Sequence, residues 1–309
     1  MALSIGTNNS ALFAAAAASS VNRDMQTSME RLSTGNRINA ASDDAAGVAI
    51  ASRLSAEIRG TNQSVRNALD GQALIATAEG GHKEIENVLQ LMREIAVQSA
   101  NDTNNTQDRL NLQSEMNTMI KEIDRISHAT TWAGTTLLDG DGAVDTNAAF
   151  SFQVGAGTGT KNQISVSIGS MTSETLDLSH TDGKSLAMVI SDADATANSR
   201  TAEEHITGNA ATTAIGNAMV TIGIIDTAIK TVNTQRSTLG ATANRLNHTV
   251  NNLTNISANL SSAQGRIQDA DFAKETTNLA KNQILQQAST AMLAQANASQ
   301  ANVLGLLRS

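Results

Sequence analysis

The stretch that decides the fold is "IDTAIKTVNTQRSTLGATANRLNHTVNNLTNISANL", residues 225–260. Apolar residues recur in it every seven positions, and a second line of positions, three residues ahead of the first, stays apolar as far as Ile229. A heptad repeat of this kind is typical of helices packed in a coiled coil. It predicts one helix over 211–265, about 80 Å long at roughly 1.5 Å per residue. The predicted coiled-coil seam consists of Ile225, Val232, Leu239, Leu246, Leu253 and Leu260.

Arg236 interrupts the second apolar line. A charged residue at one seam position commonly fixes the register of a coiled coil or forms a salt bridge across it. We therefore interpret Arg236 as a residue of register or ion pairing rather than of catalysis.

Two further helices are expected upstream. Residues 43–100 carry apolar residues at steps of three and four, and the polar stretch "NDTNNTQD" at 101–108 separates them from a third helix that ends near Ser127. Amphipathic helices cannot bury such stripes alone, so three of them predict an antiparallel bundle. The stripes are Ile85, Val88, Met92, Ile95 and Ser99 in one helix, and Leu112, Met116, Met119, Ile123 and Ile126 in the other.

The middle of the chain has a different pattern. "AFSFQVGAGTGTKNQISVSIG" alternates around Phe150 and Phe152 and again around Ile164 and Val166, with a glycine-rich break between. This pattern predicts a β-hairpin within a small, exposed β or irregular insertion. The expected fold is therefore mainly α: an elongated antiparallel helical bundle or coiled coil with a small β-hairpin-containing insertion.

The composition disfavours several classes of function. Of 309 residues only 2% are aromatic, proline and cysteine are absent, and the net charge is −8. The low aromatic content argues against a compact enzyme-like core. Because the sequence contains no basic cluster, a nucleic-acid partner is also disfavoured. No apolar run approaches the roughly 20 residues of a membrane span. The first residues lack the basic region of a secretory signal peptide, so we do not expect export by an ordinary signal peptide.

Two motifs resemble ligand-binding sites, a phosphate-binding loop and a metal site, but lack the residues that such sites need. "GAGTGTK" at 155–161 has Thr160 and Asn162 where a phosphate-binding loop needs Gly and Ser or Thr, so we interpret it as a hairpin loop. "EEH" at 203–205 has one histidine beside two acids, which is more often a solvated helix start than a metal site. We expect no catalytic residue, no cofactor and no metal, hence no enzyme.

The stretch "ERLSTGNRINAASDDAAGVAIASRL", residues 30–54, predicts a helix that stops at a polar turn and starts again. Ser33 to Asn36 can form the turn, and Ser42-Asp43-Asp44 can cap the second helix. Seven small residues, six alanines and Gly47, crowd the restart, so another backbone is expected to approach closely there.

Three segments resemble bacterial flagellin: residues 30–54, "LQLMREIAVQSANDTN" at 89–104, and "QDADFAKETTNLAKNQILQQASTAMLAQAN" at 268–297. The likeness covers roughly the first 140 and the last 100 residues. It implies that the chain is the structural subunit of the flagellar filament, used for swimming motility. It further implies export of the unfolded chain, an extracellular location, and contacts with further copies, hook-associated or cap proteins and an export chaperone.

The resemblance also implies a division into three parts. Residues 1–44 with 268–309 form a terminal helical inner-tube domain, and residues 45–140 with 205–267 form a rod-like helical bundle. Residues 141–204 form a small outward-facing segment. The terminal helices are weak in isolation, so we expect them to order only against one another and against neighbouring copies.

The resemblance points finally to a surface that innate immune receptors recognise, with Gln90, Ile95 and Glu115 at matching positions and Leu91 where the family has a key arginine. An ordinary rod surface is the favoured alternative for these residues. For the whole chain, the alternatives are a hook–filament junction protein and a coiled-coil signalling module, because heptads alone do not specify filaments.

Overall fold

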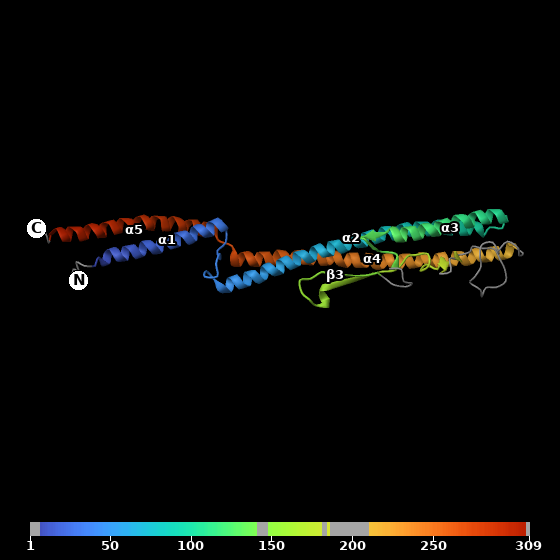
Figure 1. Cartoon of the computed structure of the whole chain (residues 1–309), viewed down its shortest axis with the longest axis horizontal. Coiled ribbons are helices and arrows are strands. Elements are labelled where there is room, and N and C mark those ends of the chain that lie inside the picture. The colour runs from blue at the N-terminus through green and yellow to red at the C-terminus, as the bar shows by residue number, and fades with distance from the viewer. Residues whose placement is uncertain (1–6, 141–147, 181–183, 186–209, 307–309) are drawn as a thin grey trace. The chain divides into compact units, whose positions relative to one another are not determined.

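The computed structural model describes residues 7–140, 148–180, 184–185 and 210–306. The chain forms two compact units. The terminal unit consists of Met1–Arg59 with Ile256–Ser309, and the central unit consists of Gly60–Asn255. Figure 1 shows the helices and strands of both, and each unit is described by itself below.

Long helices dominate, as the sequence predicts. They are α1 (Asn9–Thr34), α2 (Ala45–Ser99), α3 (Thr106–Ala129), α4 (Ala210–Gln268) and α5 (Phe272–Leu306). The expected helices over 43–100, 109–127 and 211–265 are thereby confirmed to within a few residues at each end. No proline interrupts α2 or α4, so runs of 55 and 59 residues remain continuous.

The helix ends follow from local side chains. Asn105 caps α3 in a reciprocal capping box with Asp108, which satisfies two backbone N–H groups that the helix leaves free. Gly35 ends α1 in the left-handed conformation, at φ +73°. The carboxylate of Asp44 accepts the backbone N–H of Gly47 at 2.9 Å and caps α2. The stop and restart predicted over 30–54 are therefore present.

The apolar stripes of α2, α3 and α4 form the core of the central unit. Its largest fully buried side chains include Ile85 and Met92 of α2, Met116 and Ile123 of α3, and Ile225 of α4. Each such side chain contributes about 1.5–3 kcal/mol to the free energy of unfolding when fully buried. The antiparallel bundle predicted from three stripes is confirmed.

The predicted β-hairpin is formed by β3 (Ala148–Gln153) and β4 (Gln163–Ile168), which pair antiparallel with Phe152 opposite Ile164. "GAGTGTK" lies in its connection, as a hairpin loop. The hairpin is less exposed than the sequence indicates, because Ile164, Val166 and Ile168 of β4 are all buried. Alternation along a strand buries one face, and here that face joins the core of the bundle.

α2 approaches the hairpin so closely at Gly71 that a larger side chain there would have to displace the ring of Phe152. A Cβ atom built on Gly71 would lie 3.0 Å from the ring of Phe152. Nearby, the side-chain amide of Asn67 donates to the carbonyl oxygen of Gln153 at 3.0 Å. Two shorter strand pairs complete the sheet content of the described residues: β1 (Thr131–Trp132) with β2 (Thr135–Thr136), and β5 (Ser179–His180) with β6 (Lys184–Ser185).

The turn between β1 and β2 places an alanine, Ala133, in the left-handed backbone conformation. Ala133 and Gly134 connect the strands with φ of +49° and +86°, the pattern of a type I′ turn, in which Asn-Gly is preferred. Alanine costs about 1–2 kcal/mol in this left-handed region. We expect Ala133→Asn to raise the free energy of unfolding by about 1 kcal/mol, measured by urea denaturation. Ala133→Val should lower it, and equal effects of the two variants would contradict this account of the turn.

Candidate assembly surface

The terminal unit is built on the pairing of α1 with α5, which lie side by side (Figure 1). The side-chain amide of Asn8 donates to the carbonyl oxygen of Ala296 at 3.1 Å, and the side chain of Gln286 donates to Asn22 at 2.8 Å. The guanidinium of Arg31 lies 3.8 Å from the carboxylate of Glu275. Positions rise along α1 as they fall along α5, so the two helices are antiparallel.

Little of this helix pair is buried. The described apolar residues of the terminal unit that are buried are Ala14, Ile38 and Ala51, while Phe13 is 77% exposed and Ile284 and Met292 are each 66% exposed. The central unit has the opposite distribution, with its large apolar side chains mostly in the core. The exposed large apolar residues of the terminal unit, which we call the terminal apolar surface, are Leu12, Phe13, Met29, Ile50, Ile256, Phe272, Ile284, Leu285 and Met292.

Such a surface is suited to binding other apolar surfaces. Soluble monomers rarely leave large contiguous apolar patches in water, and those that do generally use them for association. The pairing of α1 with α5 leaves Phe13, Ile284 and Met292 outside the contact between the two helices. The exposed apolar residues of α1 and α5 therefore make the terminal unit a candidate surface for binding another chain.

A polar clasp joins the ends of α1 and α4 within the terminal unit. Asn36 and Asp269 form an isolated antiparallel bridge. Beside it, the guanidinium of Arg37 donates to the carbonyl oxygen of Ile267 at 2.7 Å, where the end of α4 presents free carbonyl groups and a partial negative charge. Asp271 accepts the backbone N–H groups of Ala273 and Lys274 and so caps α5. These hydrogen bonds fix the path of the chain where α4 ends and α5 begins.

The linker before α2 is ordered by an aspartate. Asp43 accepts the backbone N–H groups of Ala40 and Asn39, each at 3.0 Å, and these hydrogen bonds hold the pKa of the Asp43 carboxyl below its usual value. Because the pKa of Asp43 is lowered in the folded state, the stability that its hydrogen bonds contribute is present above the ordinary pKa. This stability is lost as the pH falls through the pKa of the folded state.

The alanines between residues 40 and 51 are mostly exposed in the single chain, and Ala51 is the buried one.

The predicted seam lies along α4. Ile225, Val232, Leu239 and Leu246 are fully buried, Leu253 is nearly so, and Leu260 is half-buried. Arg236 forms a short ion pair with Glu86 of α2 and lies 3.9 Å from Glu79. The interpretation of Arg236 as an ion-pairing residue between helices agrees with these contacts.

The three residues of the possible receptor surface are not equally accessible. Gln90 and Glu115 are exposed, whereas Ile95 is 4% exposed and belongs to the core of the central unit. Leu91 is exposed beside them. The helical stripe of Ile85, Met92 and Ile95 already assigns Ile95 to the buried face, so position in the stripe is the better guide to its role.

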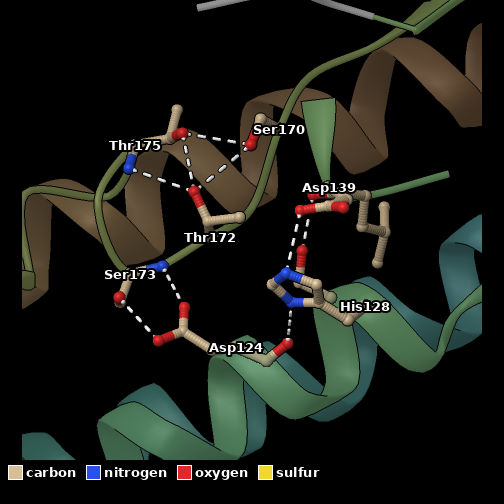
Figure 2. A network of polar contacts seen from close by, with 9 residues as sticks. Asp124, His128, Asp139, Ser170, Thr172, Ser173 and Thr175 are labelled. Carbon is tan, nitrogen blue, oxygen red and sulfur yellow. Dashed lines mark hydrogen bonds and ion pairs between the residues drawn. The ribbon is translucent and has the colours of Figure 1, made fainter. Parts of the chain in front are cut away.

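A polar network joins α3 to the segment after β4 (Figure 2). Both carboxylate oxygens of Asp124 accept from Ser173, its backbone N–H at 2.8 Å and its hydroxyl at 2.9 Å. His128 donates to the carbonyl oxygen of Asp124, and its other ring nitrogen lies 3.2 Å from Asp139. The hydroxyls of Ser170, Thr172 and Thr175 contact one another.

These contacts hold a segment in place. Met171, Leu176 and Leu178 of the same segment insert into the core, and the backbone N–H of Met171 donates to the carbonyl oxygen of Leu138 at 2.8 Å. The network therefore fixes the chain after the hairpin onto α3 while its apolar residues pack beneath.

Within the residues that the structure describes, no three His, Asp or Glu side chains gather closely enough to hold a metal ion. The "EEH" at 203–205 lies outside those residues. Over the same described ranges, none of the helices has both the length and the hydropathy needed to cross a bilayer.

Sequence reasoning missed the clasp and the surface residues at the helix starts. Arg37 carries a weak signal, since a cation is favourable near a helix C-terminus, but its partner helix lies 230 positions away. Phe13 and Phe272 carry a stronger one, because half of the four phenylalanines in an aromatic-poor chain lie in the terminal segments.

Comparisons with known proteins agree with this arrangement. The family model of the bacterial flagellin N-terminal helical region matches residues 5–143, and that of the C-terminal helical region matches residues 222–307. A flagellin of Bacillus subtilis (strain 168) is 42% identical over 300 residues, which cover 94% of this chain and 95% of that protein. The flagellar filament 33 kDa core protein of Treponema phagedenis is 38% identical over 309 residues, covering 98% and 99%.

A solved structure adds information on the fold alone. It is assigned as a flagellar hook-associated protein from Vibrio parahaemolyticus, with a TM-score of 0.57 and 17% identity, covering 74% of this chain and 100% of that one. The two family models match both helical ends, and the curated relatives match nearly the whole length. The chain therefore belongs to the bacterial flagellins, the structural subunits of the flagellar filament.

Proposed function

We propose that the chain polymerises through the terminal apolar surface, one part of which packs against a different part of this surface on further copies in the filament. The observation that carries this proposal is the exposure of Phe13, Ile284 and Met292 in a unit that buries almost no large apolar side chain. Contacts between different patches of identical copies continue indefinitely when the rotation does not close, and so generate helical filaments.

The division of labour along the chain is part of the proposal. Residues 1–44 with 268–309 would form the inner tube, residues 45–140 with 205–267 the rod, and residues 141–204 the outward-facing segment. The compact units of the single chain are divided elsewhere, between Arg59 and Gly60 and between Asn255 and Ile256. The proposed division follows the linkers at 35–44 and 269–271, where helices end.

We further propose that the chain leaves the cell unfolded, through the flagellar export channel, and works outside the cell. Family resemblance supports this route, as does the absence of cysteine from the sequence. An export chaperone and hook-associated or cap proteins are the partners that the same resemblance supports. The role is structural rather than catalytic.

For Gln90 and Glu115 we propose an ordinary role on the rod surface, exposed or in contact with another subunit. Recognition by an innate immune receptor is the alternative. It is weakened by the burial of Ile95 and by Leu91 at the position of the family's arginine, since interface arginines are frequent hot spots.

Seeded elongation tests the proposed function. Purified monomer is added to short filament fragments, and fragment length is followed by electron microscopy. We expect the fragments to lengthen many-fold with added monomer. A hook–filament junction protein would bind fragment ends without lengthening them, and a soluble signalling module would show one oligomer of fixed size in light scattering. Either outcome would overturn the proposal.

A further inference from the structure

His82 of α2 is completely buried in the central unit. Its Nδ1 lies 2.7 Å from the carbonyl oxygen of Ala78, one turn earlier in the same helix. A carbonyl only accepts, so Nδ1 must carry the proton of the neutral ring. The other nitrogen, Nε2, is then a bare acceptor, and it is buried with no hydrogen-bond partner among the described residues.

The charged groups that face His82 are Arg236 of α4 and Glu79 of its own helix. Arg236 is paired with Glu86 and also approaches Glu79, so both nearby carboxylates already form ion pairs with the guanidinium. A proton on Nε2 would create a second cation beside Arg236 and a buried N–H with no acceptor. Both consequences are unfavourable for a side chain that is completely buried.

Burial is the main reason that the pKa of His82 is lowered from its ordinary value, and the charge of Arg236 acts in the same direction. The unfolded chain therefore takes up this proton at a higher pH than the folded chain does. Stability from this site is fully present above the ordinary histidine value, about 6.5. It is lost progressively as the pH falls from there toward the folded value.

We propose that His82 is an acid-sensitive latch, whose protonation loosens the packing of α2 against α4 around Arg236. At neutral pH the ring packs as an apolar group among core residues such as Ala78 and Ile85. In mild acid, protonation places a charge on the buried ring of His82. Since a charge is unfavourable among apolar side chains, α2 and α4 separate locally to admit water. The inference concerns the central unit and does not depend on how the terminal unit assembles.

The first test compares thermal midpoints of the full-length chain at pH 7.5 and 5.0, by circular dichroism. His82→Gln keeps a donor for Ala78 but cannot gain a charge. We expect the midpoint to fall between these pH values by about 3–6 °C more in the native chain than in this variant, the shift for a tenfold change in the folding equilibrium. His248→Gln, at an exposed position of α4, should behave as the native chain does. Equal pH dependence in all three would overturn the proposal.

A second measurement does not depend on the folding of a variant. Nuclear magnetic resonance of the native chain with labelled histidines follows each imidazole from pH 8 to 5. We expect His82 to stay in the Nδ1-protonated neutral form as long as α2 remains packed against α4, and to become charged only as this packing loosens. If His82 gained its proton in a chain that keeps this packing, the latch would be excluded.

Discussion

Removal of residues 270–309 is expected to abolish elongation of filament fragments while leaving the central unit folded. The deletion takes away α5, and with it the partner of α1 and four of the nine residues of the terminal apolar surface. The core of the central unit contains no residue from the deleted segment. Electron microscopy should show no growth, and the thermal midpoint of the central unit should stay within about 2 °C of that of the full chain.

Point variants give the same test without a deletion. Phe13→Ser together with Ile284→Asn removes two large exposed apolar side chains and touches no hydrogen bond between α1 and α5. Elongation should slow by at least tenfold, about 1.4 kcal/mol or more at the interface. Leu69→Asn with Leu91→Asn changes two exposed leucines of the central unit as a control. Filaments that grow normally from the truncated chain would exclude the terminal surface as the site of assembly.

Replacing Leu246 and Leu253 with aspartate is expected to unfold the bundle. Leu246 is fully buried and Leu253 is 8% exposed, so each substitution removes apolar burial and places a carboxylate at a buried position. The combined loss should exceed about 4 kcal/mol, a large part of the stability of an ordinary domain. Circular dichroism should show most of the helical signal lost, or a thermal midpoint lowered by more than about 10 °C.

The control places the same charges next to the seam rather than in it. Asn247→Asp and Thr254→Asp alter exposed neighbours of the two leucines. Surface changes of this kind usually shift stability by less than about 0.5 kcal/mol, so the control should melt as the native chain does. A seam variant as stable as its control would mean that α4 is not packed through Leu246 and Leu253.

Much of the fold could be predicted because it rests on local periodicity. Heptads around Ile225 and Leu239 fix a helix and its buried face without knowledge of the partner. Alternation around Phe150 and Ile164 fixes a hairpin in the same way. The burial of Ile164 and Val166 could not be read from this pattern, because alternation shows that one face differs from the other and does not show what covers it.

The surface was less predictable than the core. Ile95 was assigned to a receptor surface by resemblance, although its place in the stripe with Met92 puts it inside. The clasp of Arg37 on the end of α4 joins residues 230 positions apart, and no single-sequence pattern records such a pairing. Apolar residues of α1 and α5 were expected to need partners, but which of them point outward depends on the rotation of each helix.

The antiparallel pairing of α1 with α5 has a consequence for biosynthesis. The side chain of Asn8 contacts the backbone of Ala296, so the pairing joins residues 288 positions apart in the chain. A chain whose synthesis stops before α5 lacks this pairing, however well its central unit folds. The topology thus makes the terminal helix pair depend on synthesis having passed α5.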